Sequence, residues 1–371
     1  MTDSGGIGSW VGIGGKARMS QIQESGERTA EARMRIRIAV DAVGGDYAPS
    51  EVVRGAVQAA RELGVDIILT GPRAEVAGEL ASIGADNLPI ELVDAPDVIR
   101  DSDNPILAVM RKPKNSLAIA AKLVKQGKAD AMMSAGSTGA VMLSAYRYLG
   151  TLPGVDRPII GGPFIQLAPN TFVLDLGANV GCQAYHLLNF AVAGSVFVQK
   201  FLGIENPTVG LLNVGAEEGK GNEVVKEAYS LLRESGLNFV GNVEGMDIPL
   251  GKANVIVCDG FVGNILLKFS EGLGKSLGRW LGQRLKDRLP AEDVDSIAAE
   301  LMHLVSPAEA AGGGPLWGID GVAVVCHGSS RAYQITAAIK EAKLAVESGF
   351  IATLREELEK AHRVTSANNH G

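Results

Sequence analysis

Cysteine, aromatic residues and long apolar runs are all scarce in this chain of 371 residues. The three cysteines, Cys182, Cys258 and Cys326, are widely spaced and odd in number, which indicates reduced thiols and excludes a disulfide framework or a CxxC metal site. No apolar run reaches the roughly 18 to 20 residues that a transmembrane helix needs, and no signal-peptide pattern is present. These absences predict a cytoplasmic protein and leave contact with a membrane surface open.

Positive charge is also in deficit, because 35 Lys and Arg residues face 42 Asp and Glu residues for a formal net charge of −7. A chain without a basic field does not attract a polyanion over long range, so we expect no nucleic-acid partner. The aspartates are scattered rather than clustered, and we predict neither a metal ion nor a cofactor. If the protein binds a phosphate group, donors and cations close to the binding site must therefore hold it, because no long-range positive field is present.

Glycine, in contrast, is abundant, with 47 residues, and 46% of the sequence is hydrophobic. Short apolar runs alternate with amphipathic segments from Ile36 onward, which is typical of βα units around a mostly parallel sheet with flanking helices. The length favours two lobes. The predicted strands are Ile36–Asp41, Asp66–Thr70, Ile90–Val93, Asp130–Ser134, Ile159–Ile165, Thr171–Leu176, Thr208–Val214, Phe239–Val243, Val255–Asp259 and Val322–His327. The predicted helices are Ser50–Leu63, Arg73–Ile83, Ser116–Gln126, Thr138–Leu149, Gln183–Phe201, Asn222–Ser235, Gly263–Arg288, Glu292–Val305 and Ser329–Leu358, the last broken near Gly349.

The two ends of the chain depart from this pattern. Residues 1–33 are glycine-rich and then charged, with little apolar periodicity, so we expect a disordered extension. Residues 34–361 form the expected catalytic region, with an amphipathic helical segment at 263–305. We expect a flexible tail at 362–371.

The stretch ADAMMSAGSTGA, residues 129–140, passes from an apolar run into a loop of glycines and hydroxyls and then into a helix. Unpaired N–H groups at the positive end of such a helix favour an anion. Hydroxyls add donors, and glycines let the backbone approach a ligand. We interpret this stretch as a phosphate cradle, with a purely structural turn capped by Ser137 as the alternative. The cradle residues are Ser134, Gly136, Ser137, Thr138 and Gly139.

Polar residues closely followed by glycine end one predicted strand after another. In a parallel sheet the ligand crevice lies at the carboxyl ends of the strands, so these residues are expected along one rim. The groups are Asp41 with Gly44, Gly45 and Asp46; Ser134 with Gly136; Asp175 with Gly177 and Asn179; Asn213 with Gly215; Asp259 with Gly260; and His327 with Gly328. We expect the substrate to bind at this rim.

The segment LLNVGAEEGKGNE, residues 211–223, places amide, carboxylate and ammonium groups on one loop after a buried strand. Lys220 can act as a point charge toward phosphate, accompanied by Asn213, Glu217 and Asn222. A solvated loop in which Asn222 caps the next helix is the alternative. The segment is one residue short of a Walker loop and lacks Ser or Thr after the lysine, so an NTPase is disfavoured.

His327 follows a predicted strand and precedes a helix. It can donate to an oxyanion or protonate a leaving group, or it can be a structural histidine bonded to backbone. The basic turn RKPKNS, residues 111–116, fits either a second anion site or an exposed turn at a helix start. A GxSxG elbow is missing, which disfavours an acyl-serine intermediate.

The helix predicted from Gly263 to Arg288 carries apolar residues at three- and four-residue steps, with Lys and Arg around them. Such a helix can lie on an anionic membrane or bind an acidic partner, or it can pack in a core or a dimer interface. The residues predicted to make this contact are Leu273, Leu277, Arg279, Trp280 and Arg284.

Seven runs of the sequence closely resemble the PlsX family, the acyl-[acyl carrier protein]:phosphate acyltransferases. They are IAVDAVGGDYAPSEVVRGA (38–56), ADAMMSAGSTGAVM (129–142), FVLDLGANV (172–180), VGLLNVGAEEGKGNE (209–223), FVGNVEG (239–245), VCDGFVGNILLK (257–268) and HGSS (327–330). Tyr47 stands where the family commonly has His, Ser137 where it often has Asn, and Gly181 where it often has Asp. Position 47 is therefore not predicted to act as an acid or base.

The resemblance implies a Rossmann-like fold similar to isopropylmalate dehydrogenase and phosphotransacetylase, and a homodimer at the membrane periphery. It implies conversion of acyl-carrier protein and inorganic phosphate to acyl phosphate and free carrier protein for phospholipid biosynthesis. The product would pass to a membrane glycerol-3-phosphate acyltransferase, and the residues named above on the helix predicted at Gly263–Arg288 would contact the membrane or the carrier protein. The alternatives are a short-chain acyl-CoA phosphotransacylase and a non-catalytic scaffold that senses acyl carrier or phosphate. A metal- and NAD-dependent hydroxyacid dehydrogenase would require a carboxylate cluster that the sequence lacks.

This chemistry needs no protein nucleophile, because phosphate itself attacks the thioester and a thiolate with a free pKa of about 8.5 leaves without strong acid help. The protein must position phosphate and stabilise the oxyanion. The predicted catalytic residues are Lys220, Asn222, Asn213 and His327. The predicted substrate-binding residues are Asp41, Gly44, Gly45, Asp46, Ser134, Gly136, Ser137, Thr138, Gly139, Asp175, Asn179, Glu217, Asp259 and Asn264.

Overall fold

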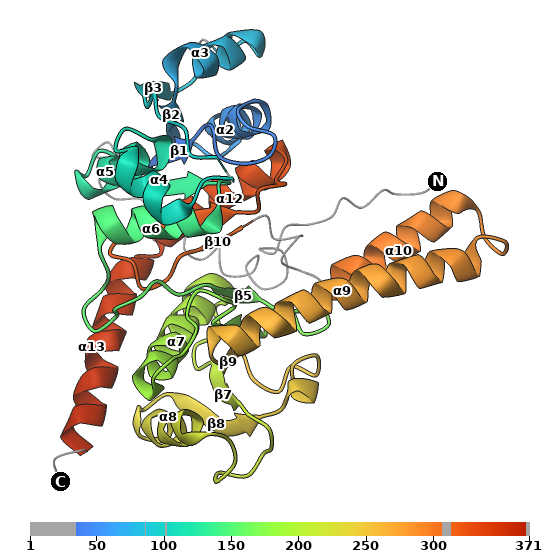
Figure 1. Ribbon diagram of the computed structural model, residues 1–371. Coiled ribbons are helices and arrows are strands. Elements are labelled where there is room, and N and C mark those ends of the chain that lie inside the picture. The colour runs from blue at the N-terminus through green and yellow to red at the C-terminus, as the bar shows by residue number, and fades with distance from the viewer. Residues whose placement is uncertain (1–34, 86, 101, 306–312, 369–371) are drawn as a thin grey trace, which may run out of the picture.

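Two sheets, each with its own helices, form two lobes joined by a few segments (Figure 1). This architecture is seen in a computed structural model that describes residues 35–85, 87–100, 102–305 and 313–368. The extension predicted at residues 1–33 lies outside the described residues. The predicted α/β class with two lobes is confirmed.

The first lobe is built on a six-stranded sheet of order β10-β11-β4-β1-β2-β3, parallel except for the edge pair β10–β11. Ile38 of the central strand lies opposite Ile67 on one side and Ala131 on the other. The strands are β1 (Arg37–Asp41), β2 (Asp66–Gly71), β3 (Ile90–Asp94), β4 (Ala131–Ser134), β10 (Gly313–Pro315) and β11 (Val322–Cys326). The helices are α2 (Ser50–Glu62), α3 (Arg73–Ser82), α4 (Pro105–Arg111), α5 (Ser116–Lys125), α6 (Thr138–Leu149) and α12 (Ala332–Glu347).

Apolar side chains on both faces bury this sheet, as expected for parallel strands. Ile38 and Val40 of β1 join the larger core with α2 and α12, whereas Ala39 joins a second core with α5 and α6. Helices therefore cover both faces. All carboxyl ends of the parallel strands remain at one edge, where the loops toward the helices begin.

The second lobe contains a five-stranded sheet of order β5-β6-β9-β7-β8, parallel except for the edge pair β5–β6. Its strands are β5 (Gly161–Pro163), β6 (Phe172–Leu174), β7 (Thr208–Leu212), β8 (Asn238–Val243) and β9 (Val255–Val257). Its helical segments are α7 (Ala184–Phe197), the π-helix η2 (Val198–Leu202), α8 (Glu223–Glu234) and the 3-10 turn η3 (Gly245–Asp247). Because α7 is apolar on nearly every side, it is buried between this sheet and the helices α8 and α13.

Two connections hold the lobes together. Ile159, just before β5, exchanges backbone hydrogen bonds of 2.9 and 3.0 Å with Trp317, just after β10. The Trp317 side chain is fully buried. Helix α13 (Phe350–Asn368) runs along both lobes (Figure 1) and packs against α7 and α12. The break predicted near Gly349 is confirmed, since this residue has φ +64° between α12 and α13.

Helices α9 (Gly260–Leu285) and α10 (Ala291–Val305) form a long arm that projects away from both lobes (Figure 1). Glycines let the two helices approach closely, because a Cβ on Gly274 would lie 2.6 Å from Cγ2 of Val305. The arm therefore begins at the second lobe and presents most of its length to the surroundings.

Several predicted boundaries need correction. Helix α9 begins at Gly260 rather than at 263, and the strand predicted at 159–165 has only the three residues of β5. Helix α4 and strand β10 were not predicted. The flexible tail predicted from residue 362 is wrong as far as Asn368, because α13 continues to that residue and buries Thr365.

Candidate active site

A buried hydrogen-bond chain lies under the predicted cradle. The Ser134 hydroxyl at the end of β4 donates to Oδ2 of Asp41 at the end of β1 over 2.6 Å, and it accepts from the Gly136 N–H over 2.9 Å. Both side chains are buried, and burial raises the pKa of Asp41 while the hydroxyls of Ser116 and Ser134 oppose the rise. Asp41 and Ser134 therefore support the loop from beneath rather than face a ligand, which corrects their predicted role in binding.

The first turn of α6 forms the outer surface of the cradle. Ser137 occupies the N-cap position, but its side chain makes no capping hydrogen bond, so its hydroxyl is not committed to the helix. Thr138 and Gly139 are exposed, and among the described residues no backbone hydrogen bond is made by their N–H groups, whereas the Ala140 N–H already donates to the Ser137 carbonyl over 2.9 Å. The partial positive charge of the helix end adds to these donors. This turn offers an anion both backbone and hydroxyl donors.

The loop after β1 packs against the cradle backbone to backbone. A Cβ on Gly44 would lie 2.4 Å from Oδ2 of Asp41 and 2.7 Å from the Gly136 nitrogen, distances that no side chain tolerates. Gly45 has φ +108°, and its hypothetical Cβ would lie 3.1 Å from the Gly328 carbonyl oxygen. Glycine is required at both positions because three loops converge there.

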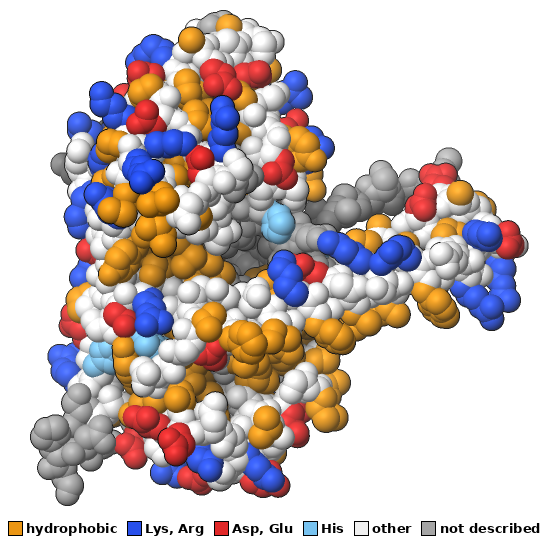
Figure 2. All heavy atoms as spheres, viewed as in Figure 1, with side chains coloured by type: hydrophobic (Ala, Val, Ile, Leu, Met, Phe, Trp, Pro, Cys, Tyr) orange, Lys and Arg blue, Asp and Glu red, His pale blue; other side chains and the backbone are white. Residues whose placement is uncertain are grey.

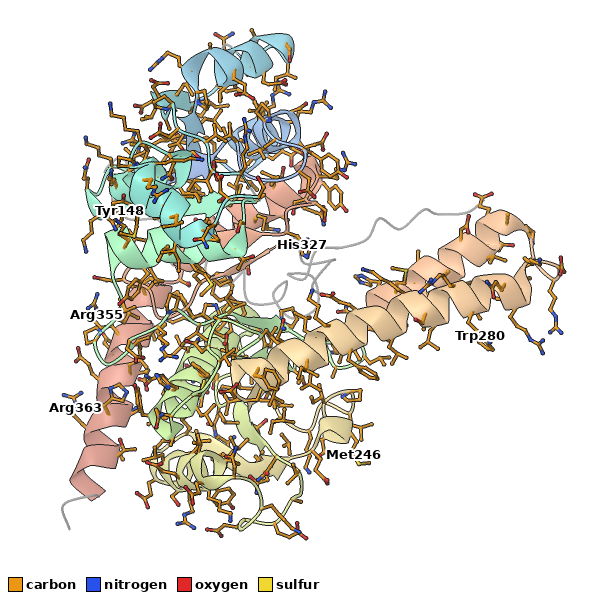
Figure 3. All side chains as sticks on the ribbon, in the orientation of Figure 1. Tyr148, Met246, Trp280, His327, Arg355 and Arg363 are labelled. Carbon is orange, nitrogen blue, oxygen red and sulfur yellow. The ribbon has the colours of Figure 1, made fainter. Side chains whose placement is uncertain are left out.

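The third of these loops follows β11. The Asp46 N–H donates to the Gly328 carbonyl over 2.8 Å, and Oγ of Ser329 lies 3.3 Å from Nδ1 of His327. His327 is exposed at the edge of the first lobe and faces the space above the root of α9 (Figure 3). The structure thus gathers the loops after β1, β4 and β11 at one rim. The other three groups predicted for the same rim follow β6, β7 and β9 and belong to the second sheet, so the prediction of a single rim is corrected.

The predicted carboxylates of the second lobe hold its loops together. Oδ1 of Asp175 accepts from the Ile160 N–H over 3.0 Å and Oδ2 from the Asn179 N–H over 2.5 Å. The oxygens of Asp259 accept from the N–H groups of Cys182 and Phe261, each over 2.7 Å. Asp175 is fully buried, and burial raises its pKa to about 6. These carboxylates and the buried residue Asn179 hold the backbone of their loops in place. Their predicted contact with substrate is therefore corrected.

Asn264 is placed differently from these buried groups. It is exposed in the first turn of α9, and a Cβ on Gly177 would lie 3.2 Å from its Cβ and from its Oδ1. The loop after β6 and the start of α9 therefore meet at Asn264. Its amide lies at the carboxyl edge of the second sheet, so its predicted substrate contact remains a prediction.

The loop after β7 is held by its own amides. Asn213 donates from Nδ2 to the Lys220 carbonyl over 3.1 Å and accepts from the Val214 N–H over 2.8 Å. Asn222 caps α8, because its Oδ1 accepts from the Val225 N–H over 3.0 Å. The alternative interpretation of Asn222 as a helix cap is therefore confirmed.

The cations and anions of this loop face outward. Lys220 and Glu217 are exposed, and within the described part of the chain no carboxylate pairs with the Lys220 ammonium. Strand β7 belongs to the second sheet and the cradle follows β4 of the first, and among the described residues no hydrogen bond or ion pair joins this loop to the cradle. The predicted action of Lys220 on phosphate remains a prediction.

Comparison with known proteins supplies what geometry alone does not. The family model described as "Fatty acid synthesis protein" matches residues 36–353. A phosphate acyltransferase from Desulforamulus reducens is 46% identical over 87% of this chain and 98% of its own length. One from Thermosynechococcus vestitus is 46% identical over 84% of this chain and 92% of its own length. The chain belongs to this family.

Members of the fatty acid synthesis protein family named phosphate acyltransferase thus confirm the predicted PlsX resemblance and the predicted enzyme class, an acyltransferase of lipid synthesis. Two phosphotransacetylases share the fold. That of Streptococcus pyogenes has a TM-score of 0.57 at 20% identity over 88% of this chain and 94% of its own. That of Staphylococcus aureus has a TM-score of 0.54 at 18% identity over 85% and 94%. The predicted phosphotransacetylase-like fold is confirmed.

The cysteines of this family member are poor nucleophiles. Burial and the neighbouring Asp259 carboxylate raise the pKa of Cys182 to about 12. Burial also raises the pKa of Cys258 and Cys326. The thiols stay protonated at neutral pH, which agrees with a reaction that forms no acyl-cysteine.

Part of the basic turn at residues 111–116 is used in structural contacts. Nζ of Lys112 donates to the Val98 carbonyl and to Asp103 over 2.8 and 2.6 Å, and Asn115 caps α5. Ser116, which was not predicted as a site residue, instead acts on Asp41 from the helix start. Its position directly after a capping Asn was the available signal.

Proposed function

We propose that this chain transfers an acyl group from an acyl-carrier protein thioester to inorganic phosphate, giving acyl phosphate and free carrier protein for phospholipid synthesis. The observation that carries this proposal is the exposed first turn of α6, held from beneath by the chain from Gly136 through Ser134 to Asp41. The name of the relatives, phosphate acyltransferase, supports phosphate as the acceptor. The proposed catalytic region spans residues 34–361.

In the proposed reaction a phosphate oxygen attacks the thioester carbonyl carbon. The C–O bond forms, the carbonyl oxygen takes negative charge, and the C–S bond then breaks to release the carrier thiolate. Phosphate bound on Ser137, Thr138 and the N–H groups of the first turn needs no activation by a base, because it is already an anion at neutral pH. Positioning and oxyanion stabilisation supply the rate.

His327 is the side chain best placed to help the leaving thiolate or the oxyanion, since it is exposed on the loop beside the cradle. Lys220 would neutralise phosphate charge, while Asn213 and Asn222 would act chiefly by shaping its loop. Asn264 would present its amide from the opposite lobe. A ligand between the lobes would be contacted from both sheets.

Ser137→Ala and Lys220→Ala test the two proposed phosphate contacts. We expect each variant to raise the KM for phosphate by about tenfold, because each removes one charged or polar contact to an anion. The assay is acyl-phosphate formation at limiting phosphate. Unchanged rates in both variants would remove these roles.

Substrate choice separates the proposal from its alternatives. The enzyme is offered palmitoyl-carrier protein and acetyl-CoA, each with phosphate. Preference for acetyl-CoA would indicate a short-chain phosphotransacylase. Binding of carrier protein without consumption of either thioester would indicate a non-catalytic scaffold.

The arm supports a proposed homodimer with peripheral contact to the membrane, where the product would meet a glycerol-3-phosphate acyltransferase. Large apolar side chains are exposed along α9, and orange side chains gather on one side of it (Figure 2). The exposed large apolar residues of α9 are Phe261, Val262, Ile265, Phe269, Leu273 and Trp280. An apolar stripe of this length favours burial against a partner. None of the described helices is long and apolar enough to span a membrane.

Leu273→Glu combined with Trp280→Glu distinguishes the two contacts. The two replaced side chains are exposed, as are those of Arg279 and Arg284, whereas Leu277 is half-buried. The double variant therefore changes the surface of α9 and leaves its packing against α10 in place. Light scattering reports dimer loss, and sedimentation with anionic liposomes reports membrane contact. A folded dimer that still binds lipid would show that this surface is wrong.

A further inference from the structure

Helix α4 carries an apolar patch that the proposed function does not use. Its seven residues, PILAVMR, bury only Ala108 and Val109. Ile106 and Met110 are each 59% exposed, and Leu107 is 46% exposed. A short helix that turns most of its large apolar side chains outward is unusual for a surface that meets only water.

Two free cations border this patch. Arg111 and Lys114 are exposed, and neither forms an ion pair with any carboxylate among the described residues. The nearby acidic groups are already engaged, since Asp103 pairs with Lys112 and Asp97 accepts from the Lys114 N–H. The patch therefore combines apolar area with positive charge on a protein whose net charge is −7.

The patch lies directly beside the cradle. Helix α4 packs on α6, and Cγ of Pro105 is 3.4 Å from the place where a Cβ on Gly139 would sit. Gly139 belongs to the first turn of α6, where phosphate is proposed to bind. A protein bound to α4 would place a thioester group that it carries at the entrance of the cradle.

We propose that the exposed face of α4, consisting of Ile106, Leu107 and Met110 with Arg111 and Lys114, docks the carrier protein that delivers the acyl thioester. This inference rests on the proposed function. Acyl carriers are acidic proteins that present helices with apolar residues among carboxylates, which complements both parts of this surface. Apolar contact gives affinity, and the two cations steer and orient the encounter.

Two double variants test the surface, Arg111→Glu with Lys114→Glu and Ile106→Ser with Met110→Ser. All four side chains are exposed or outward-facing, so α4 keeps its buried residues. The matched control is Arg61→Glu with Lys128→Glu, the same charge change at the opposite edge of the first sheet, where both side chains are exposed. Kinetics compare palmitoyl-carrier protein with palmitoyl-pantetheine, which offers the same thioester without the protein.

We expect each α4 variant to raise the KM for palmitoyl-carrier protein about tenfold, with kcat and the KM for palmitoyl-pantetheine unchanged. The control variant should match the wild type. Equal effects on both thioesters, no effect on either, or an equal effect in the control would overturn the docking surface.

Direct binding separates this inference from the proposed function. Fluorescence anisotropy of labelled palmitoyl-carrier protein measures affinity without turnover. If the wild-type enzyme consumes no thioester and only the α4 variants lose carrier binding, the proposed function fails and the docking surface stands. Unchanged carrier affinity in the α4 variants would refute it, as would a loss confined to anionic-vesicle binding or to self-association.

Discussion

Replacing Gly44 with alanine should damage the cradle more than any comparable change of one methyl group. The added Cβ would lie 2.4 Å from Oδ2 of Asp41, 2.7 Å from the Gly136 nitrogen and 2.9 Å from Oγ of Ser134. Ordinary contact begins at 3.4 Å, so the first distance is about 1 Å too short. The Gly136 nitrogen is backbone, and the two side-chain oxygens are held in place by the buried hydrogen bonds beneath the cradle.

The magnitude follows from this geometry. Overpacking against rigid neighbours costs typically about 1 to 3 kcal/mol, and we expect Gly44→Ala near the upper end of that range. Relief requires the loop after β1 or the Gly136 backbone to move by several tenths of an ångström. Since the same backbone is proposed to position phosphate, we expect the KM for phosphate to rise by more than about tenfold, as small displacements of positioning groups are costly.

Urea unfolding followed by circular dichroism measures the first effect, and acyl-phosphate formation at varied phosphate measures the second. Gly78→Ala is the control, because Gly78 lies in α3 with nothing within 4 Å of the added Cβ. That variant should gain about 0.5 to 1 kcal/mol from helix propensity and keep its kinetics. A Gly44→Ala enzyme with wild-type stability and phosphate KM would refute the reasoning.

Three further predictions use other contacts. Ser134→Ala removes the donor to Asp41 and the acceptor of the Gly136 N–H, so urea unfolding should show a loss of about 1 to 3 kcal/mol. Burial raises the pKa of Asp175 from 3.8 to about 6, so its stabilising contribution is fully present below pH 3.8 and is lost as the pH rises to 6; across this interval the unfolding free energy should fall more in the wild type than in Asp175→Asn. Gly274→Ala places a Cβ 2.6 Å from Val305, and thermal melting of the purified protein should start earlier than in Gly272→Ala, where the site is open.

The sequence predicted most elements because their patterns are long or strongly apolar. Strands such as β4 and β9 are fully buried runs, and α2 and α8 are amphipathic over three turns or more. One helix and one strand were not predicted from the sequence. Helix α4 has seven residues, too few to show a period, and β10 reads GGP, a composition that disfavours strands except at a sheet edge.

The sequence located part of the rim. The loops after β1, β4 and β11 contact one another, while the groups after β6, β7 and β9 lie on the second sheet, a division into two sheets that strand-end residues alone do not reveal. The sequence also does not reveal whether a carboxylate at a strand end faces a ligand or its own loop. Where a buried strand turns into a loop, its N–H groups need acceptors, and Asp175 and Asp259 supply them.

The difference between a carboxyl group that faces a ligand and one that faces its own loop explains how the proposed phosphate site can lie directly above Asp41. An ionised Asp41 would repel the anion on the cradle, yet burial shifts its pKa upward, in the direction that reduces this charge. The Ser134 hydroxyl bonds both to the carboxyl group and to the Gly136 N–H, and the outer face of the loop offers hydroxyl and backbone donors. An acidic chain would in this way bind the proposed phosphate through local dipoles, while its negative charge lies below or away from the site.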